Sequence, residues 1–214
     1  TCGIGVATAN SPQGPFTDHG KMFRSNEIGV QNSIDPSLLQ YEGRNYLVWG
    51  SFRGIYVIEL TADGLSIMSG AKKKRIAGTA FEAVYIHKHG DYYYMFASIG
   101  SCCQGVKSTY KVVVGRSKKV WGPYKDKTGK PMLKNGYSLV IGANDHFVGN
   151  GHGSQIIQDD AGQDWLLYHG FSRSTPENGR ILLLDQIKWD QEGWPYVEGG
   201  SPSYETQKAP VFNN

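Results

Sequence analysis

The feature that most constrains the fold is a hairpin pattern that occurs three times along the chain. Residues 82–98 are the clearest copy, because two runs of apolar and aromatic residues flank the turn signal His89-Gly90-Asp91. Residues 35–52 and 152–171 repeat this arrangement. Runs of this composition, bounded by turn residues, are typical of β-strands. The three copies therefore predict a chain built mostly from antiparallel strands.

One polar residue opens each hairpin: Asp35, Glu82 or His152. Asp35 lies 11 positions before Tyr46 in the second run of its hairpin, and Glu82 lies 11 positions before Tyr93. The corresponding spacing from His152 to Trp165 is two residues longer. The hairpins start 47 and 70 residues apart, which is the spacing of propeller blades. If the hairpins are inner strands, the three polar residues face the propeller axis at one end. We expect a site there.

A second repeat lies between the hairpins. A strand-like run ends in Gly14-Pro15-Phe16, and another ends in Gly122-Pro123-Tyr124. The chain has 214 residues, of which 28 are Gly, 13 Tyr, 8 Phe and 5 Trp, as many short strands and tight turns require. No stretch shows sustained helical periodicity. We therefore expect one all-β domain over residues 1–214, with little helix.

The charge of the chain and its cysteines argue against several classes of protein. The net charge of +3 is too small to argue for nucleic acid, and the basic run 72–75 is expected to be a solvated turn between blades. The chain contains no apolar run of membrane-spanning length, which argues against a membrane partner. Three cysteines exclude a complete disulfide framework, and for the adjacent Cys102 and Cys103 we favour reduced thiols over a vicinal disulfide.

Glu82 is the strongest candidate for acid chemistry. It lies between Phe81 and Ala83-Val84, and an apolar setting favours the protonated form of a carboxyl group. A strand-end Glu that faces water is the alternative for Glu82, and an Asx turn before Pro36 is the alternative for Asp35. Two carboxylates in different environments are what glycoside hydrolysis requires.

His152 lies between two glycines, which leaves its ring accessible. It is a candidate metal ligand, substrate contact or structural histidine. The other histidines form no pair spaced i, i+4 on a helix.

Three short motifs resemble glycoside hydrolase family 43: Ile34-Asp35-Pro36-Ser37, Phe81-Glu82-Ala83 and Gly151-His152-Gly153-Ser154. Within that family, residues 101–117 are similar to arabinan endo-1,5-α-L-arabinanases. The resemblance implies a five-bladed β-propeller, an extracellular or periplasmic location, and hydrolysis of arabinan or arabino-oligosaccharides with inversion. Action on xylosyl or galactosyl linkages, or a non-catalytic carbohydrate-binding propeller, are the alternatives.

The resemblance also implies roles for single residues. Glu82 matches the general acid, Asp35 the aspartate that tunes and orients it, and His152 the central histidine associated with a calcium ion or its water shell. The positions that match sugar subsites are Asn32, Trp49, Ser51, Phe52 and Cys102.

The general base departs from the family pattern. In the family it is an aspartate of the leading blade, whereas Asp18 is the only aspartate before Asp35 and follows an outer turn. We therefore expect an incomplete propeller without its N-terminal blade, impaired as an isolated chain. Its gap would be covered by the N-terminal segment of the same enzyme or by another copy of the chain.

Overall fold

The computed structural model describes residues 1–213, which form antiparallel sheets with only short helical turns. The residues group into two compact units, Thr1–Val84 and the residues from Tyr85 onward. Each unit is described by itself. The short helical turns are α1 (Ser25–Ile28), η1 (Gly105–Lys107), η2 (Met132–Lys134), η3 (Pro176–Asn178) and η4 (Glu198–Gly200).

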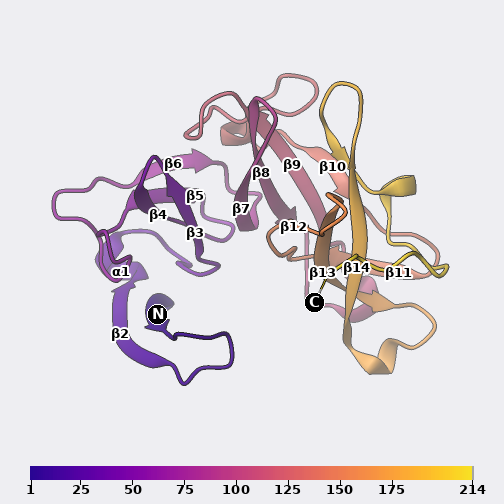
Figure 1. The fold of residues 1–214 in the computed structure, drawn as a ribbon, viewed down its shortest axis with the longest axis horizontal. Helices are drawn as coiled ribbons and strands as arrows, with labels where there is room; N and C mark the ends of the chain where they lie inside the picture. Colours follow the sequence, from indigo (N-terminus) through magenta and orange to yellow (C-terminus); the bar gives the residue numbers. More distant parts are fainter. Residues whose placement is uncertain (214) are drawn as a thin grey trace. The chain divides into compact units, whose positions relative to one another are not determined.

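The first unit holds a two-stranded and a four-stranded sheet. Each strand pairs with its neighbour in the sequence, so the sheets are simple meanders (Figure 1). The strands are β1 (Gly3–Thr8), β2 (Thr17–Arg24), β3 (Ser37–Tyr41), β4 (Arg44–Trp49), β5 (Ile55–Glu59) and β6 (Lys74–Ala77).

Trp49 is the centre of the core of the first unit. Its ring lies 5.4 Å from Phe23 of β2 and 5.8 Å from Tyr56 of β5. The side chain is fully buried, and Nε1 donates a hydrogen bond to Ser33 Oγ at 3.1 Å. Trp49 therefore packs the two sheets together and fixes the loop that leads into β3.

The second unit holds two larger sheets. One has the order β10-β9-β8-β7, and the other has the order β11-β13-β14-β15 with β12 added to β13. The strand β7 begins in the last residues of the first unit. The strands are β7 (Glu82–His89), β8 (Tyr92–Ile99), β9 (Lys111–Ser117), β10 (Ser138–Ile141), β11 (Phe147–Gly151), β12 (Ile157–Gln158), β13 (Asp164–Ser172), β14 (Arg180–Trp189) and β15 (Pro195–Tyr196).

A single apolar cluster joins these two sheets. Tyr85 and Phe96 contribute from β7 and β8, with their rings stacked 5.1 Å apart, and Leu166 and Tyr168 contribute from β13. Five of the twelve buried residues in the cluster are aromatic, and each of these buries a large apolar area on a pleated surface. The core therefore fixes β7 of one sheet against β13 of the other.

The prediction of an all-β, propeller-type chain is confirmed: residues 1–213 form four antiparallel sheets of consecutive strands. The hairpins predicted at 35–52 and 82–98 are the pairs β3–β4 and β7–β8. The two Gly-Pro repeats also match, because Gly14-Pro15 and Gly122-Pro123 are both cis. Within the described residues, no helix has the length and apolarity needed to cross a lipid bilayer.

Two expectations about local structure are wrong. The third hairpin does not start at His152: β11 ends just before it, and a register shift after Val148 leaves His152 between β11 and β12. The basic run is not wholly a turn, since Lys74 and Arg75 lie in β6. Arg75 fits there because its Nε donates to the carbonyl of Ala77 at 3.0 Å, which satisfies the side chain at the sheet edge.

Candidate active site

Several of the candidate residues in the two units have a left-handed backbone. The φ angles are +54° at Asn32, +55° at Asp35, +51° at Phe52, +51° at Ala83 and +52° at His152. Residues other than Gly rarely adopt this region of φ and ψ, because the conformation costs about 1–3 kcal/mol for each residue. Residues strained in this way are concentrated at functional sites. The other two such residues of the described chain are in a turn and at the end of a short helical turn. The strained backbone is thus concentrated at candidate residues of each unit.

Asp35 anchors the backbone next to Glu82. Its Oδ2 accepts a hydrogen bond from the backbone N–H of Ala83 at 3.1 Å. This bond links the loop before β3 to the first residues of β7, which are 48 positions apart. Because Ala83 has a positive φ, the bond also stabilises a backbone conformation that is unfavourable for Ala. Asp35 therefore acts on the position of Glu82 through the backbone.

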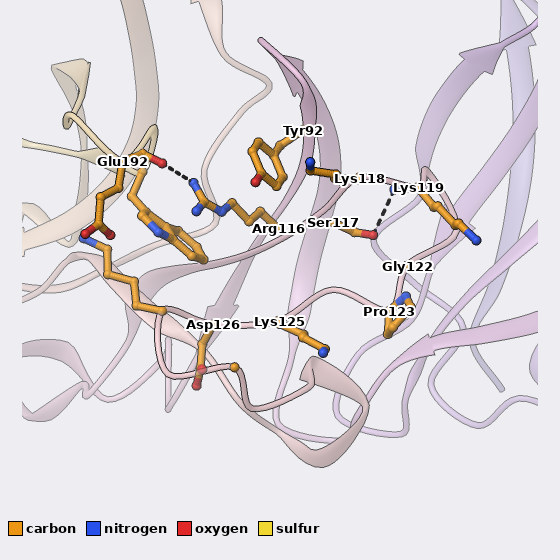
Figure 2. Close-up of a pocket in the computed structure, with 13 residues that line it drawn as sticks. Tyr92, Arg116, Ser117, Lys118, Lys119, Gly122, Pro123, Lys125, Asp126 and Glu192 are labelled. Carbon is orange, nitrogen blue, oxygen red and sulfur yellow. Dashed lines mark hydrogen bonds between the residues drawn. The ribbon is translucent and has the colours of Figure 1, made fainter.

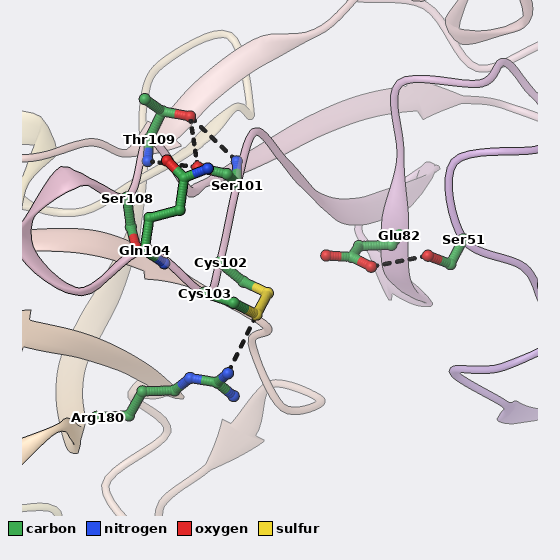
Figure 3. Close-up of a disulfide and its surroundings, with 9 residues drawn as sticks. All are labelled: Ser51, Glu82, Ser101, Cys102, Cys103, Gln104, Ser108, Thr109 and Arg180. Carbon is green, nitrogen blue, oxygen red and sulfur yellow. Dashed lines mark hydrogen bonds between the residues drawn. A yellow bond between two sulfur atoms is a disulfide. The ribbon is translucent and has the colours of Figure 1, made fainter.

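Glu82 is the first residue of β7 and is only 8 % exposed. Its Oε2 accepts a hydrogen bond from Ser51 Oγ at 2.8 Å, and Ser51 is 1 % exposed. Figure 3 shows one carboxylate oxygen held by Ser51 and the other directed away from it. Glu82 is therefore a buried carboxyl group with a fixed orientation and one oxygen turned toward other partners.

The loop that follows β4 completes this arrangement. Asn32 Nδ2 donates to the carbonyl of Ser51 at 3.1 Å, and the N–H of Phe52 donates to the carbonyl of Phe81 at 2.9 Å. The N–H of Gly50 donates to the carbonyl of Ile34 at 3.0 Å. Residues 50–52 thus lie near Asp35, because the second strand of an antiparallel hairpin ends beside the start of the first. Trp49, in contrast, is fully buried in the core, so we assign it to support of this loop and not to a sugar contact.

In the second unit, His152 is exposed and its backbone N–H donates to Ser98 Oγ at 2.8 Å. Its ring lies 6.4 Å from the ring of His169 on β13. Burial, together with the charges of Arg180 and His152, lowers the pKa of His169 to about 4. His169 is therefore neutral at neutral pH. The sequence reasoning gave it no role, although it lies at the end of the second strand of the third hairpin.

Cys102 and Cys103 form a disulfide with an S–S distance of 2.08 Å, so the expectation of reduced thiols is wrong. Arg180 Nη2 lies 3.1 Å from Cys103 Sγ (Figure 3). The loop around the bridge is fixed at its ends, where Ser101 N–H donates to Thr109 Oγ1 at 3.0 Å. The pairing depends on this loop conformation, which the sequence pattern did not indicate. Among the described residues, Cys2 is the free cysteine, and it is exposed.

A cavity of about 550 Å³ in the second unit is lined by several cationic side chains (Figure 2). The guanidinium of Arg116 lies 4.3 Å from the ring of Tyr92 and 4.2 Å from that of Trp194. It also donates to the carbonyl of Glu192 at 2.5 Å. Arg116 thus occupies the aromatic faces that a sugar ring would need.

The sequence matches a known family and several known proteins. The model of glycosyl hydrolases family 43 matches residues 1–195. The extracellular exo-α-(1→5)-L-arabinofuranosidase ArbA of Cellvibrio japonicus is 38% identical over 92% of this chain and 62% of its own length. The extracellular endo-α-(1→5)-L-arabinanase 1 of Bacillus subtilis is 36% identical over 91% of this chain and 60% of its own length. The chain thus spans about three fifths of the length of these relatives.

Solved structures give the same result. The α-L-arabinanase of Cellvibrio cellulosa complexed with arabinohexaose has a TM-score of 0.84 and 34% identity, and the match covers 92% of this chain and 69% of that one. The endo-1,5-α-L-arabinanase of Thermotoga petrophila has a TM-score of 0.80 at 25% identity, over 97% of this chain and 55% of that one. With a family model that matches nearly the whole sequence and a fold shared over its length, this chain belongs to glycosyl hydrolases family 43.

Proposed function

We propose that this chain contributes the acid side of an active site that hydrolyses α-1,5-linked L-arabinofuranosyl chains with inversion. The observation that carries the proposal is Glu82, a buried carboxyl group held by Ser51 and placed beside a backbone that Asp35 anchors. The names of the relatives, which act on α-1,5-linked arabinan, support the choice of sugar. The arabinohexaose complex of a structural relative supports arabino-oligosaccharides as ligands.

In this mechanism Glu82 gives its proton to the glycosidic oxygen while the C–O bond to the anomeric carbon breaks. A water molecule attacks the anomeric carbon from the opposite face and loses a proton to a general base. One sugar leaves with a free hydroxyl group, and the other gains a hydroxyl group of inverted configuration. Glu82 ends the cycle ionised and takes up a proton from solvent.

Ser51 and Asp35 prepare Glu82 for this step. Ser51 holds Oε2, so the acidic oxygen is the other one, Oε1. Asp35 fixes the peptide that follows Glu82 and so limits the positions that its side chain can reach. A misplaced catalytic group can cost about 10²-fold in rate, so both residues are positioning residues of this reaction.

No general base is assigned within residues 1–213. Asp18, the only aspartate before Asp35, lies exposed on β2 and accepts a hydrogen bond from the N–H of Gly20 at 2.7 Å. That bond stays within β2 and does not connect Asp18 to Glu82. We therefore propose that water activation needs a carboxylate from outside these residues. The chain would then bind arabinan but hydrolyse it slowly.

We also propose a calcium ion near His152, which this histidine contacts through water molecules and not directly. Ca²⁺ takes six to eight oxygen ligands, mostly from carboxylates and carbonyls. Within the described residues, the group of three metal-ligating side chains that comes together does not include His152. Residues around His152 therefore do not form a direct carboxylate cage. We propose a hydrated ion whose water shell His152 orients, and we derive no step of the reaction from it.

For the location we propose the extracellular space, on the basis of the two extracellular relatives. The experiment that tests the function is calorimetry with arabinohexaose and with xylohexaose. It is followed by measurement of reducing ends released from debranched arabinan, xylan and galactan. Selective binding of arabinohexaose supports the proposal. Equal binding of both sugars, or faster release from xylan or galactan, contradicts it.

A further inference from the structure

The second half of β7 carries a pair of histidines that the proposed reaction does not use. His87 and His89 are two positions apart on a strand, and side chains at i and i+2 share one face. That face also carries Tyr85, which belongs to the core between the two sheets of the second unit. The pair therefore points toward the neighbouring sheet.

Asp164, the first residue of β13, meets the two histidines there. One ligand atom from each of His87, His89 and Asp164 lies within 4.8 Å of the other two. His89 Nδ1 is 3.9 Å from Asp164 Oδ2. In a tetrahedral zinc site, bonds of about 2.0–2.1 Å place the ligand atoms roughly 3.3 Å apart. Small side-chain rotations would close the remaining gap.

The carboxylate of Asp164 is buried and already oriented. Trp189 Nε1 donates to its Oδ2 at 2.7 Å, and Gln158 Nε2 donates to its Oδ1 at 3.2 Å. A carboxylate has about four acceptor positions, so these two bonds leave capacity for a cation. Hydrogen bonds of this kind fix metal-ligating carboxylates in known sites. The ring of Trp189 also stacks on His89 at 3.7 Å with planes 7° apart, which fixes the imidazole.

Tyr85, on the same face of β7 as the two histidines, also brings a polar group into the space between the two sheets. Its hydroxyl group is buried and makes no hydrogen bond to the protein among the described residues. A buried polar group without a partner is costly, and it calls for an explanation. A bound water molecule between the two sheets would give this hydroxyl group a partner.

We propose that His87, His89 and Asp164 bind a divalent transition-metal ion, with Zn²⁺ as the best match. Two imidazoles and one carboxylate are a ligand set that suits Zn²⁺, and a bound water would complete a tetrahedron. Ca²⁺ and Mg²⁺ prefer sites of oxygen ligands, so they match poorly. The ion would tie β7 of one sheet to β13 of the next. Its role is to fasten two sheets together, separate from the chemistry at Glu82.

The first test is calorimetry of the metal-free chain with ZnCl₂ alone, together with the unfolding temperature with and without zinc. We expect one Zn²⁺ per chain and a higher unfolding temperature, because a ligand that binds only the folded state stabilises it. His87→Gln, His89→Gln and Asp164→Asn should each weaken zinc binding by at least about tenfold. Trp189→Phe keeps the stacked ring and removes the donor to Asp164, so it should weaken zinc binding less than the three ligand variants do.

Two histidine variants are the matched controls. His146→Gln changes an exposed histidine stacked on Tyr204, and His152→Gln changes the histidine beside the proposed calcium ion. Both should bind zinc like the original chain. X-ray absorption at the zinc edge should report two imidazoles and a carboxylate. The proposal is overturned if calorimetry detects no zinc binding. It is also overturned if His87→Gln and His89→Gln bind zinc normally, or if His152→Gln alone abolishes binding.

Discussion

The hydrogen bond from Ala83 N–H to Asp35 Oδ2 has a measurable energy. Replacing Asp35 by Ala removes a charged acceptor, and such bonds contribute about 1.5–3 kcal/mol. It also leaves Ala at a φ of +55°, which Asp tolerates better than Ala by roughly 1 kcal/mol. Because Asp35 is partly exposed, the lower ends of these ranges apply, and we expect Asp35→Ala to destabilise the first unit by about 2–3 kcal/mol.

Two further variants separate the two contributions. Asp35→Asn keeps an acceptor oxygen and a residue that tolerates a positive φ, so its cost should stay below about 1 kcal/mol. Glu42→Ala is the matched control, because Glu42 has a φ of +49° in the exposed turn between β3 and β4. It should change stability by less than about 0.5 kcal/mol.

Urea unfolding and thermal melts measure these differences. A cost of 2–3 kcal/mol corresponds to a fall in unfolding temperature of roughly 5–10 °C for a chain of this size. Turnover of arabinan should fall in Asp35→Ala mainly through kcat, because the acid is misplaced while the sugar contacts remain. The account of Asp35 is refuted if Asp35→Ala is no more destabilising than Glu42→Ala, or if Asn damages the chain as much as Ala.

Three other predictions concern Ser51, the isolated chain and acid stability. Ser51→Ala removes the donor to Glu82 and should lower kcat at least about tenfold while leaving KM within about threefold; an unchanged kcat would contradict the positioning role. The chain alone should cleave linear arabinan much more slowly than the named relatives, and sodium formate, a small exogenous base, should raise its rate. Activity that matches the relatives would show that a base lies within these residues. Burial opposes ionisation of Asp159, but hydrogen bonds from Gln163, Val211, Trp165 and Ala161 outweigh it and lower the pKa. Asp159 should therefore stabilise the fold above pH 3.8, and this stabilisation should be lost as pH falls further. In melts from pH 7 to pH 3, Asp159→Asn should be less stable at pH 7, and the difference should shrink below pH 3.8; a constant difference would exclude the ionised carboxylate as its cause.

The sequence alone predicted the hairpins at Asp35 and Glu82, because aromatic and apolar runs with clear turns leave few other folds. The return of the loop after β4 to Asp35 follows from the same hairpin, since an antiparallel partner must end there. The left-handed backbone at Ala83 and Phe52 was out of reach, because neither residue favours it and distant hydrogen bonds impose it.

Other features depended on contacts between distant residues. The disulfide between Cys102 and Cys103 requires a loop shape that no spacing rule gives. His87 and His89 do not have the i, i+4 spacing that pairs histidines on a helix, whereas their i, i+2 spacing pairs them on one face of a strand. Their meeting with Asp164 is a consequence of packing between two sheets.

The most direct test of the central claim is the effect of Glu82→Gln on two substrates. The variant keeps the size and a hydrogen-bond acceptor for Ser51, but it has no acidic proton. We expect a loss of at least about 10²-fold on linear arabinan, measured against the unsubstituted chain under the same conditions. On an aryl arabinofuranoside with an acidic phenol, whose leaving group needs no proton, the loss should be much smaller. An equal loss on both substrates would show that Glu82 is not the general acid.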